Sequence, residues 1–352
     1  MGQIKKIFKK FRKNQIFFPV IAMALLLLFN LVFTKNFLSI EIINGHLVGS
    51  LIDIFKRGAP LILMSMGVTM VIATRGTDIS IGSVVAISAA VCTSLIGGGR
   101  DISNVPMLIA IIIALIISAI LGLWNGFLVA KLGVQPIVAT MILMTAGRGI
   151  AQLITKGNII TVYYEPFYKI GAGYIFGIPV AVYIAAAVFI LLMLLVKKTS
   201  FGMFVKSVGY NRVASRYTGI TVDRIILICY TISGLCAGIA GLIISSEVKS
   251  ADGNNAGLYL ELDAILSSAM AGNSMAGGKF SIPASAIGAL VIQTLTTTIY
   301  ASGVAPEITM VVKAIIVILI CIIQSPQFTK LAPSNIFARK EEVQYEENTV
   351  KL

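Results

Sequence analysis

IAIIIALIISAIL (residues 109–121) is the stretch that decides the fold class, because it carries no charge and lies inside a charge-free run covering residues 105–130. A helix needs about 20 apolar residues to cross the roughly 30 Å hydrocarbon core of a bilayer, and this run is long enough. A strand of a membrane β-barrel would alternate apolar and polar residues, and this stretch does not. It therefore predicts a membrane-spanning α-helix.

Comparable runs occur along the whole chain. The other long charge-free runs cover residues 14–34, 79–99, 170–196, 225–246 and 280–306. Shorter ones cover residues 58–74, 132–147, 264–278 and 314–329. They predict an all-α, polytopic membrane helical bundle of about ten transmembrane helices, with a broken or re-entrant helix near residues 258–280. The composition agrees, because 57% hydrophobic and only 12% charged residues leave too little polar surface for a water-soluble globule.

The basic residues indicate how the bundle is oriented. Six Lys and Arg residues precede the first apolar run, and further basic clusters lie in residues 197–224 and 329–352. An even number of crossings puts all of these regions on one side, which the positive-inside rule identifies as the cytoplasm. We expect a basic cytoplasmic N-terminus (1–15), a single transmembrane domain (16–328) with the cytoplasmic loop 197–224, and a cytoplasmic C-terminal tail (329–352). The net charge of +13 then reports orientation and requires no nucleic-acid partner.

Little in the sequence indicates catalysis or metal binding. The chain has one His and four Cys, and the cysteines lie in apolar runs without a C-x-x-C pair. GNSMAGGKF (272–280) lacks the Gly-Lys-Ser/Thr of a phosphate-binding loop. We therefore expect no enzymatic activity, no catalytic residue, no metal site and no cofactor bound by this chain. The long runs also contain no carboxylate, which disfavours a carrier driven by an ion gradient and favours energy supplied by a partner.

Polar residues interrupt the apolar pattern in three places, the first being TRGTDISIGS (74–83). Asp78 and Ser80 are candidate N-caps for the helix that follows, since their oxygens can accept hydrogen bonds from its first N–H groups. Gly76 and Gly82 allow the chain to turn back tightly into the bundle. Structural capping and solute contact both stay open for this segment.

The second interruption, FGMFVKSVGYNRVASRYTGI (201–220), lies in the basic loop. Apolar residues recur at i, i+3, i+4 and i+7 from Phe201 to Val208, which predicts a short amphipathic helix ending at Gly209. Another short helical stretch, VASRYTG, follows Asn211. Such a helix either lies on anionic membrane lipid or docks into a cytoplasmic partner.

The third interruption, residues 251–291, contains a short helix flanked by polar residues. Asn254 and Asn255 precede it, and Glu261 and Asp263 fall in its first turns, where carboxylates favour the positive end of a helix. AGNSMAGG then breaks the helix before the next apolar run. Membrane proteins build solute sites at such breaks, and uncharged amides and hydroxyls suit a neutral polyhydroxylated solute.

Three further polar residues lie within the predicted spans. Arg148 and Lys313 are near the outer ends of their helices, where each either snorkels toward water or serves a function. Asn125 lies inside an apolar run, so its amide should face the lumen or bond another helix.

In their order and spacing these segments resemble the membrane permease subunit of bacterial ATP-binding cassette (ABC) importers for monosaccharides, of the ribose/galactofuranose/xylose type. The resemblance covers nearly all of residues 16–328. It also rests on LWNGFLVAKLGVQPIVATMILMTAGRGIAQLIT (123–155) and ISGLCAGIAGLI (232–243). ADGNNAGLYLELDAI (251–265) is similar to the galactofuranose-type permeases in particular. Arg75 stands where the family usually has a small Gly.

The resemblance implies a permease that translocates a monosaccharide, galactofuranose- or ribose-like, into the cell by alternating access. ATP would be used by a partner, an ABC ATPase subunit or tandem ATPase. A second permease (homodimer or related permease) and an extracytoplasmic sugar-binding protein would complete the system, in the inner or plasma membrane of a bacterium. The alternative is an ion-gradient-driven secondary carrier of a small polar solute.

The resemblance also assigns roles to particular residues. The family's ATPase coupling loop falls here on Gly202, Val205, Val208, Gly209, Asn211, Ala214 and Gly219. For the substrate pathway we predict Asn125, Asn254, Asn255, Glu261, Asp78 and Arg148.

Overall fold

The computed structural model describes residues 15–34, 37–43, 45–97, 104–303, 308–315 and 318. Its helices are α2 (Phe17–Phe33), α3 (Ser50–Ala73), α4 (Ile81–Ile96), α5 (Met107–Ala130), α6 (Pro136–Thr155), α7 (Glu165–Ala172), α8 (Val180–Lys198), α9 (Phe201–Tyr210), α10 (Arg212–Tyr217), α11 (Val222–Glu247), α12 (Leu260–Met270) and α13 (Ile282–Ala301). Its strands are β1 (Glu41–Ile43), β2 (His46–Val48), β3 (Ile160–Thr161), β4 (Tyr174–Ile175), β5 (Ile178–Pro179) and β6 (Ser250–Ala251). The predicted C-terminal tail and nearly all of the predicted N-terminal region lie outside the described residues, so those boundaries stay predictions.

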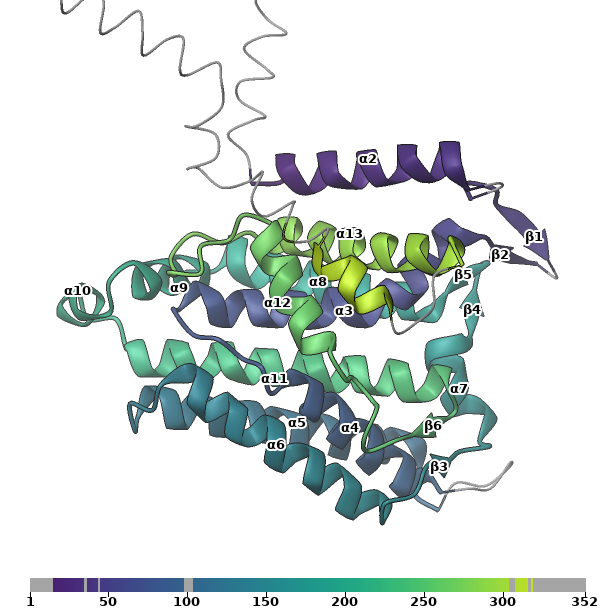
Figure 1. The fold of residues 1–352 in the computed structure, drawn as a ribbon. Coiled ribbons are helices and arrows are strands. Elements are labelled where there is room, and N and C mark those ends of the chain that lie inside the picture. The colour runs from purple at the N-terminus through teal and green to yellow at the C-terminus, as the bar shows by residue number, and fades with distance from the viewer. Residues whose placement is uncertain are drawn as a thin grey trace, which may run out of the picture.

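Most of the helices run along a common direction, as expected for a membrane bundle (Figure 1). Six in the described chain are long and apolar enough to cross a membrane, namely α3, α5, α6, α8, α11 and α13. The apolar helices α2 and α4 are shorter. With α12, every crossing predicted before residue 307 has a helical segment in the described chain; residues 308–315 are also helical, but most of the predicted crossing 314–329 lies outside the described residues. This confirms an all-α polytopic membrane protein.

The core of the bundle forms around α3 and α11, whose side chains are mostly buried, whereas α5 and α8 are mostly exposed. Small residues bring the backbones of α5 and α11 together. A Cβ at Gly122 would lie 2.4 Å from the carbonyl oxygen of Tyr230, and one at Gly234 would lie 2.4 Å from that of Ser118. Because lipid is as apolar as a side chain, such close packing is a main source of helix association in a membrane.

Two helices, α4 and α12, start inside the bundle after non-helical segments. Residues 75–80 lead into α4, and residues 252–259 lead into α12. The two N-termini meet, since a Cβ at Gly82 would lie 2.1 Å from Glu261 Oε2 and 2.8 Å from the carbonyl oxygen of Gly257. After Met270 the chain stays non-helical until α13 begins. The break predicted near residues 258–280 is therefore confirmed, and α4 is a second discontinuous helix.

The crossing predicted in the apolar run 170–196 is confirmed as α8, but the first part of the run is not part of that helix. α7 ends at Ala172, and β4 pairs with β5 in a hairpin before α8 begins at Val180. Gly177 at the turn has φ +80°, a conformation that glycine adopts easily, and Pro179 removes a backbone donor. Apolar content alone does not reveal such a turn. The strand pairs gather at the end of the bundle opposite α9 and α10 (Figure 1).

Candidate functional site

Three of the predicted pathway residues, Arg148, Asn254 and Asn255, lie where the segment before α12 crosses α6. Arg148 on α6 donates hydrogen bonds through Nη1 to the carbonyl oxygens of Asn254 (3.1 Å) and Ala256. Gln152, one turn along α6, donates to the Asn254 side-chain oxygen. The side chains of Asn254 and Asn255 are exposed on this surface. Arg148 therefore positions the segment and does not simply snorkel toward water.

Asp252 organises the turn that presents the two asparagines. Its Oδ1 accepts from the backbone N–H of Asn254 at 2.8 Å, and its Oδ2 accepts from Asn255 Nδ2 at 2.7 Å. Partial burial alone would raise the pKa of Asp252. The hydrogen bonds from Asn254 and Asn255 and the charge of Arg148 outweigh burial and lower it, so the carboxylate stays ionised and holds the turn.

Glu261 lies in the first turn of α12 and is only 1% exposed. Its Oε2 has no hydrogen-bond partner among the described residues and lies against Gly82 at the start of α4. The positive ends of two helices thus converge on one carboxylate, which compensates part of its burial. An oxygen left without a partner at the break of two helices can bind a solute group that enters there.

The remaining two predicted pathway residues, Asp78 and Asn125, lie in the interior. Asp78 Oδ1 accepts from Ser80 Oγ at 2.7 Å and from Ser80 N at 3.1 Å, and its Oδ2 accepts from Ser233 Oγ at 2.8 Å. Asn125 Nδ2 donates to Ser80 Oγ at 2.8 Å. Asn125 therefore bonds another segment, and this network joins α5 and α11 to the start of α4. Solute contact by Asp78 and Asn125 stays a prediction.

The predicted capping of α4 was wrong in detail. Ser80 occupies the N-cap position, but its side chain accepts no hydrogen bond from the helix. The hydroxyl is instead donated to Asp78. Its oxygen accepts from Asn125 Nδ2 instead of from an N–H group of the helix.

The predicted coupling-loop residues divide into a buried set and an exposed set. The buried set fastens α9 to the bundle and consists of Gly202, Val205, Val208 and Gly209. The exposed set consists of Asn211, Ala214 and Gly219. α9 ends at Tyr210 and not at Gly209 as predicted, because Gly209 packs inside: a Cβ there would lie 1.9 Å from the carbonyl oxygen of Ala73.

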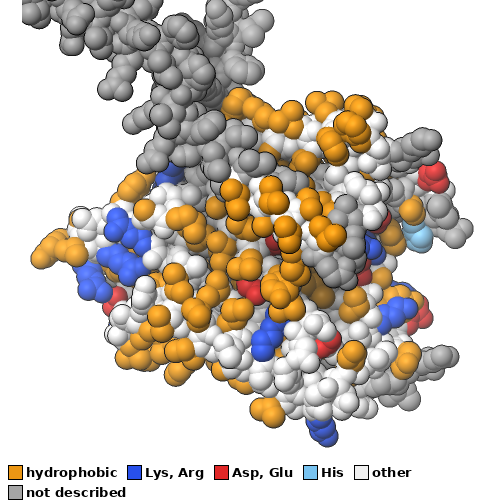
Figure 2. Space-filling view, in the orientation of Figure 1, with side chains coloured by type: hydrophobic (Ala, Val, Ile, Leu, Met, Phe, Trp, Pro, Cys, Tyr) orange, Lys and Arg blue, Asp and Glu red, His pale blue; other side chains and the backbone are white. Residues whose placement is uncertain are grey.

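Asn211 and the short helix α10 form the outermost part of this loop. The Asn211 side chain accepts from the N–H groups of Val213 and Ala214, both at 3.0 Å, and so caps α10. Val213 and Tyr217 are 61% and 88% exposed. Basic side chains gather over the same end of the bundle (Figure 2). Exposed apolar side chains beside positive charge are typical of a docking surface.

Sequence reasoning missed a polar zipper between α3, α12 and α13. Thr69 Oγ1 lies within hydrogen-bonding distance of Ser285 Oγ (2.7 Å) and Ser268 Oγ (3.1 Å), and Ser267 Oγ donates to Ser65 Oγ at 2.6 Å. Hydroxyls at helical spacing along α3 (Ser65 and Thr69) were a signal that could have found it. Since α3 also contacts the coupling loop at Ala73, one rigid helix joins that loop to α12.

A second feature that was missed is the ion pair between Asp263 on α12 and Lys313, with Nζ 2.8 Å from Oδ2. Snorkelling, one of the two interpretations offered for Lys313, is therefore wrong. The carboxylate attracts the ammonium group across the bundle, and no sequence pattern indicates a pairing between residues so far apart.

Comparisons with known proteins agree with this architecture. The family described as branched-chain amino acid transport system / permease component matches residues 50–321. A galactofuranose transporter permease protein of Escherichia coli (strain K12) is 43% identical over 312 residues, 89% of this chain and 90% of that protein. A fructose import permease protein of Bifidobacterium longum is 37% identical over 92% of this chain and 91% of that protein.

A ribose import permease protein of Haemophilus influenzae is 33% identical over 77% of this chain and 83% of that protein. No solved structure matches the chain significantly. The family match extends from α3 to beyond α13, and the relatives agree with the resemblance seen in the sequence. The chain is a multi-pass membrane protein that belongs to the family of transport-system permease components.

Proposed function

We propose that this chain is the membrane permease subunit of an ABC importer that moves a monosaccharide, galactofuranose- or ribose-like, into a bacterial cell. The observation that carries the proposal is the 43% identity over 89% of the chain to a galactofuranose permease. The description of the family names branched-chain amino acids, whereas the relatives compared above are named for sugars. Uncharged amides at the α6–α12 crossing also suit a neutral hydroxylated solute better than a zwitterion.

The two ends of the bundle differ in a way that fits two different partners. The α9–α10 end carries the exposed loop and the basic charge, so it is the cytoplasmic end at which an ATPase docks. The opposite end carries the strand pairs and α7, and it faces an extracytoplasmic sugar-binding protein. A second permease, identical or related, completes the pathway. Both termini are cytoplasmic on this assignment.

In the proposed mechanism the partner ATPase hydrolyses ATP. The conformational change of the ATPase then displaces α9 and α10. Arg75 Nε donates to the carbonyl oxygen of Gly209 at 2.6 Å, and Arg212 Nη2 donates to that of Thr74 at 2.8 Å. A displacement of the loop therefore pulls on the end of α3. Through the polar zipper α3 carries it to α12, where Glu261 and the asparagine turn lie. Alternating access follows when this unit tilts against the rest of the bundle.

Reconstitution tests the proposal. The chain is co-purified with an ABC ATPase and a sugar-binding protein from the same organism, placed in liposomes, and supplied with labelled monosaccharides and with leucine. ATP-dependent uptake of a sugar and no uptake of leucine is the expected result. Uptake by this chain alone under an ion gradient would instead support the secondary carrier, and no ATP-dependent uptake of any monosaccharide would overturn the proposal.

A further inference from the structure

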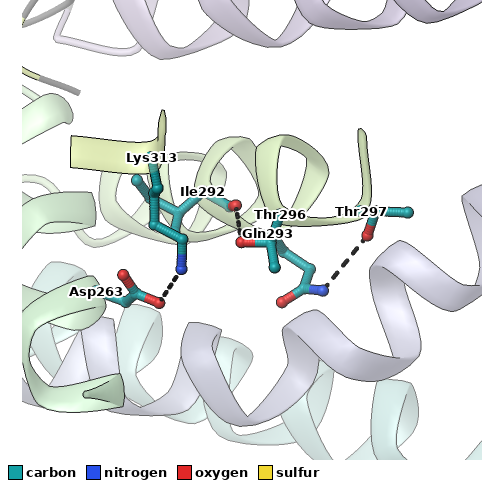
Figure 3. Close-up of polar contacts among 6 residues, drawn as sticks. All are labelled: Asp263, Ile292, Gln293, Thr296, Thr297 and Lys313. Atoms are coloured by element: carbon teal, nitrogen blue, oxygen red, sulfur yellow. Dashed lines mark hydrogen bonds and ion pairs between the residues drawn. The ribbon is translucent and has the colours of Figure 1, made fainter. Parts of the chain in front are cut away.

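A cavity of about 360 Å³ lies between α12, α13 and residues 308–315. It is separate from the asparagine turn, and none of the pathway residues predicted from the sequence lines it. The polar side chains in its wall include Asp263, Gln293, Thr296 and Lys313. Figure 3 shows these four side chains, which come from all three lining segments. Its volume falls within the range of roughly 300–1,000 Å³ usual for small-molecule sites.

The ion pair between Asp263 and Lys313 is costly at this place. The two side chains are 14% and 17% exposed, and helices predicted to lie in the membrane surround them. Removing two charges from water is repaid only when further hydrogen bonds satisfy their remaining capacity. A single hydrogen bond joins the two groups. The Asp263 carboxylate can accept further hydrogen bonds, and the Lys313 ammonium group can donate further ones. Charges kept within a membrane at such cost usually serve a function.

The neighbouring polar groups have hydrogen-bonding capacity to spare. Among the described residues, Gln293 Nε2 has one acceptor, Thr297 Oγ1 at 3.5 Å, which is a weak bond. Thr296 donates its hydroxyl proton to the carbonyl oxygen of Ile292 at 2.9 Å, so the hydroxyl oxygen can still accept (Figure 3). The cavity therefore presents both donors and acceptors.

Tyrosine side chains complete the lining at two edges, where Tyr259 and Tyr300 are 46% and 50% exposed. Tyr259 has φ +65°, a left-handed conformation that is strained for a non-glycine residue. Aromatic rings offer an apolar surface to the C–H face of a sugar ring, while charged and amide groups bind its hydroxyls.

We propose that this cavity is a binding subsite for a neutral polyhydroxylated solute on its way through the bundle. Hydroxyls of the solute would accept from Lys313 and Gln293 and donate to Asp263 and Thr296. The solute should be neutral because the site already balances its own charge, and an ionic solute would compete with one partner of the pair. This inference rests on the proposed function, since it names a station on the same sugar pathway.

Cysteine accessibility tests the subsite in the assembled, reconstituted importer. Thr296→Cys is introduced in a Cys321→Ser background; Cys92, Cys229 and Cys236 are buried and should give little background. A charged, membrane-impermeant thiol reagent should label Thr296→Cys, and the transported sugar with ATP should slow the labelling several-fold. Ile116→Cys, on the exposed apolar surface of α5, is the control for lipid-facing positions and should not be labelled.

A second variant connects the protection to a hydrogen bond. Gln293→Ala in the Thr296→Cys protein should raise the sugar concentration that gives half-protection by about two- to tenfold. If the parent importer takes up sugar but Thr296→Cys is not labelled, or is labelled without protection, the subsite is disproved while the proposed function stands. If the parent importer takes up no monosaccharide, the proposed function itself fails.

Variants of the ion pair distinguish solute binding by Asp263 and Lys313 from a purely structural role of the pair. The reversed pair, Asp263→Lys with Lys313→Asp, keeps the ion pair and should therefore assemble normally. The sugar concentration that gives half-protection should still change, since the hydrogen-bond donor and acceptor have exchanged places. Full recovery of sugar protection by the reversed pair would show that the ion pair only holds helices together. The control is Lys56→Gln, which breaks the Lys56–Glu247 pair of similar exposure (3.3 Å; 16% and 25%) outside this cavity. It should leave half-protection unchanged.

Discussion

Arg75 Nε lies 2.6 Å from the carbonyl oxygen of Gly209, so a residue two positions after the end of α3 is hydrogen-bonded directly to helix α9 of the predicted coupling loop. Arg75 Nη2 donates to the carbonyl oxygen of Tyr210 at the same distance. Arg75 adopts φ +62°, which favours glycine. The backbone strain at Arg75 is therefore offset by two hydrogen bonds that join the loop to the end of α3.

Arg75→Gly should separate folding from coupling. Glycine relieves the backbone strain, and the buried residues of α9 still anchor the loop, so the importer should assemble. The loss of both hydrogen bonds should lower sugar transported per ATP hydrolysed by about threefold or more. Arg75→Ala, which removes the hydrogen bonds and keeps the strain, should uncouple similarly and also destabilise the protein. Wild-type stoichiometry in Arg75→Gly would show that the link carries no movement.

Gly209→Ala should destabilise the fold rather than specifically uncouple ATP hydrolysis from transport. The added Cβ would lie 1.9 Å from the carbonyl oxygen of Ala73, which already accepts from Gly278 N at 2.9 Å. Overpacking of this kind costs about 1–3 kcal/mol, so the melting temperature in detergent should fall. Gly149→Ala, on the exposed surface of α6, is the control, because no atom lies within 4 Å of its Cβ position and its backbone is helical. Equal melting temperatures for the two variants would contradict the packing.

Tyr217 and Val213 should carry the affinity for the ATPase without contributing to the fold. They are 88% and 61% exposed on α10, and exposed aromatic side chains often dominate an interface. Tyr217→Ala should weaken co-purification of the ATPase by about tenfold and leave the melting temperature of the isolated permease unchanged. Tyr183, 40% exposed near the opposite end of the bundle, provides the control Tyr183→Ala. Undiminished ATPase capture by Tyr217→Ala would place the docking surface elsewhere.

The sequence predicted the spans well because hydrocarbon imposes a length and an apolar composition that a charge-free run records directly. It also predicted the break around α12, since AGNSMAGG cannot continue an apolar helix. It did not predict that Gly209 is buried, or that Asp263 pairs with Lys313, because both depend on which helices become neighbours. Asp78 illustrates the same limit: its position suggested a cap, and its burial made it the acceptor of a network.

Ser233→Ala should show whether Asp78 supports the structure or contacts the solute. The substitution leaves Asp78 Oδ2 without the hydroxyl that lies 2.8 Å away, and a buried acceptor without a partner costs about 1–3 kcal/mol. A structural Asp78 predicts a lower melting temperature with an unchanged order of preference among sugars. Ser245→Ala, on the same helix, removes a buried hydroxyl that bonds only within α11 and should cost less. A changed sugar preference in Ser233→Ala at normal stability would instead place Asp78 on the solute pathway, because the freed carboxylate oxygen could then accept a hydrogen bond from the solute.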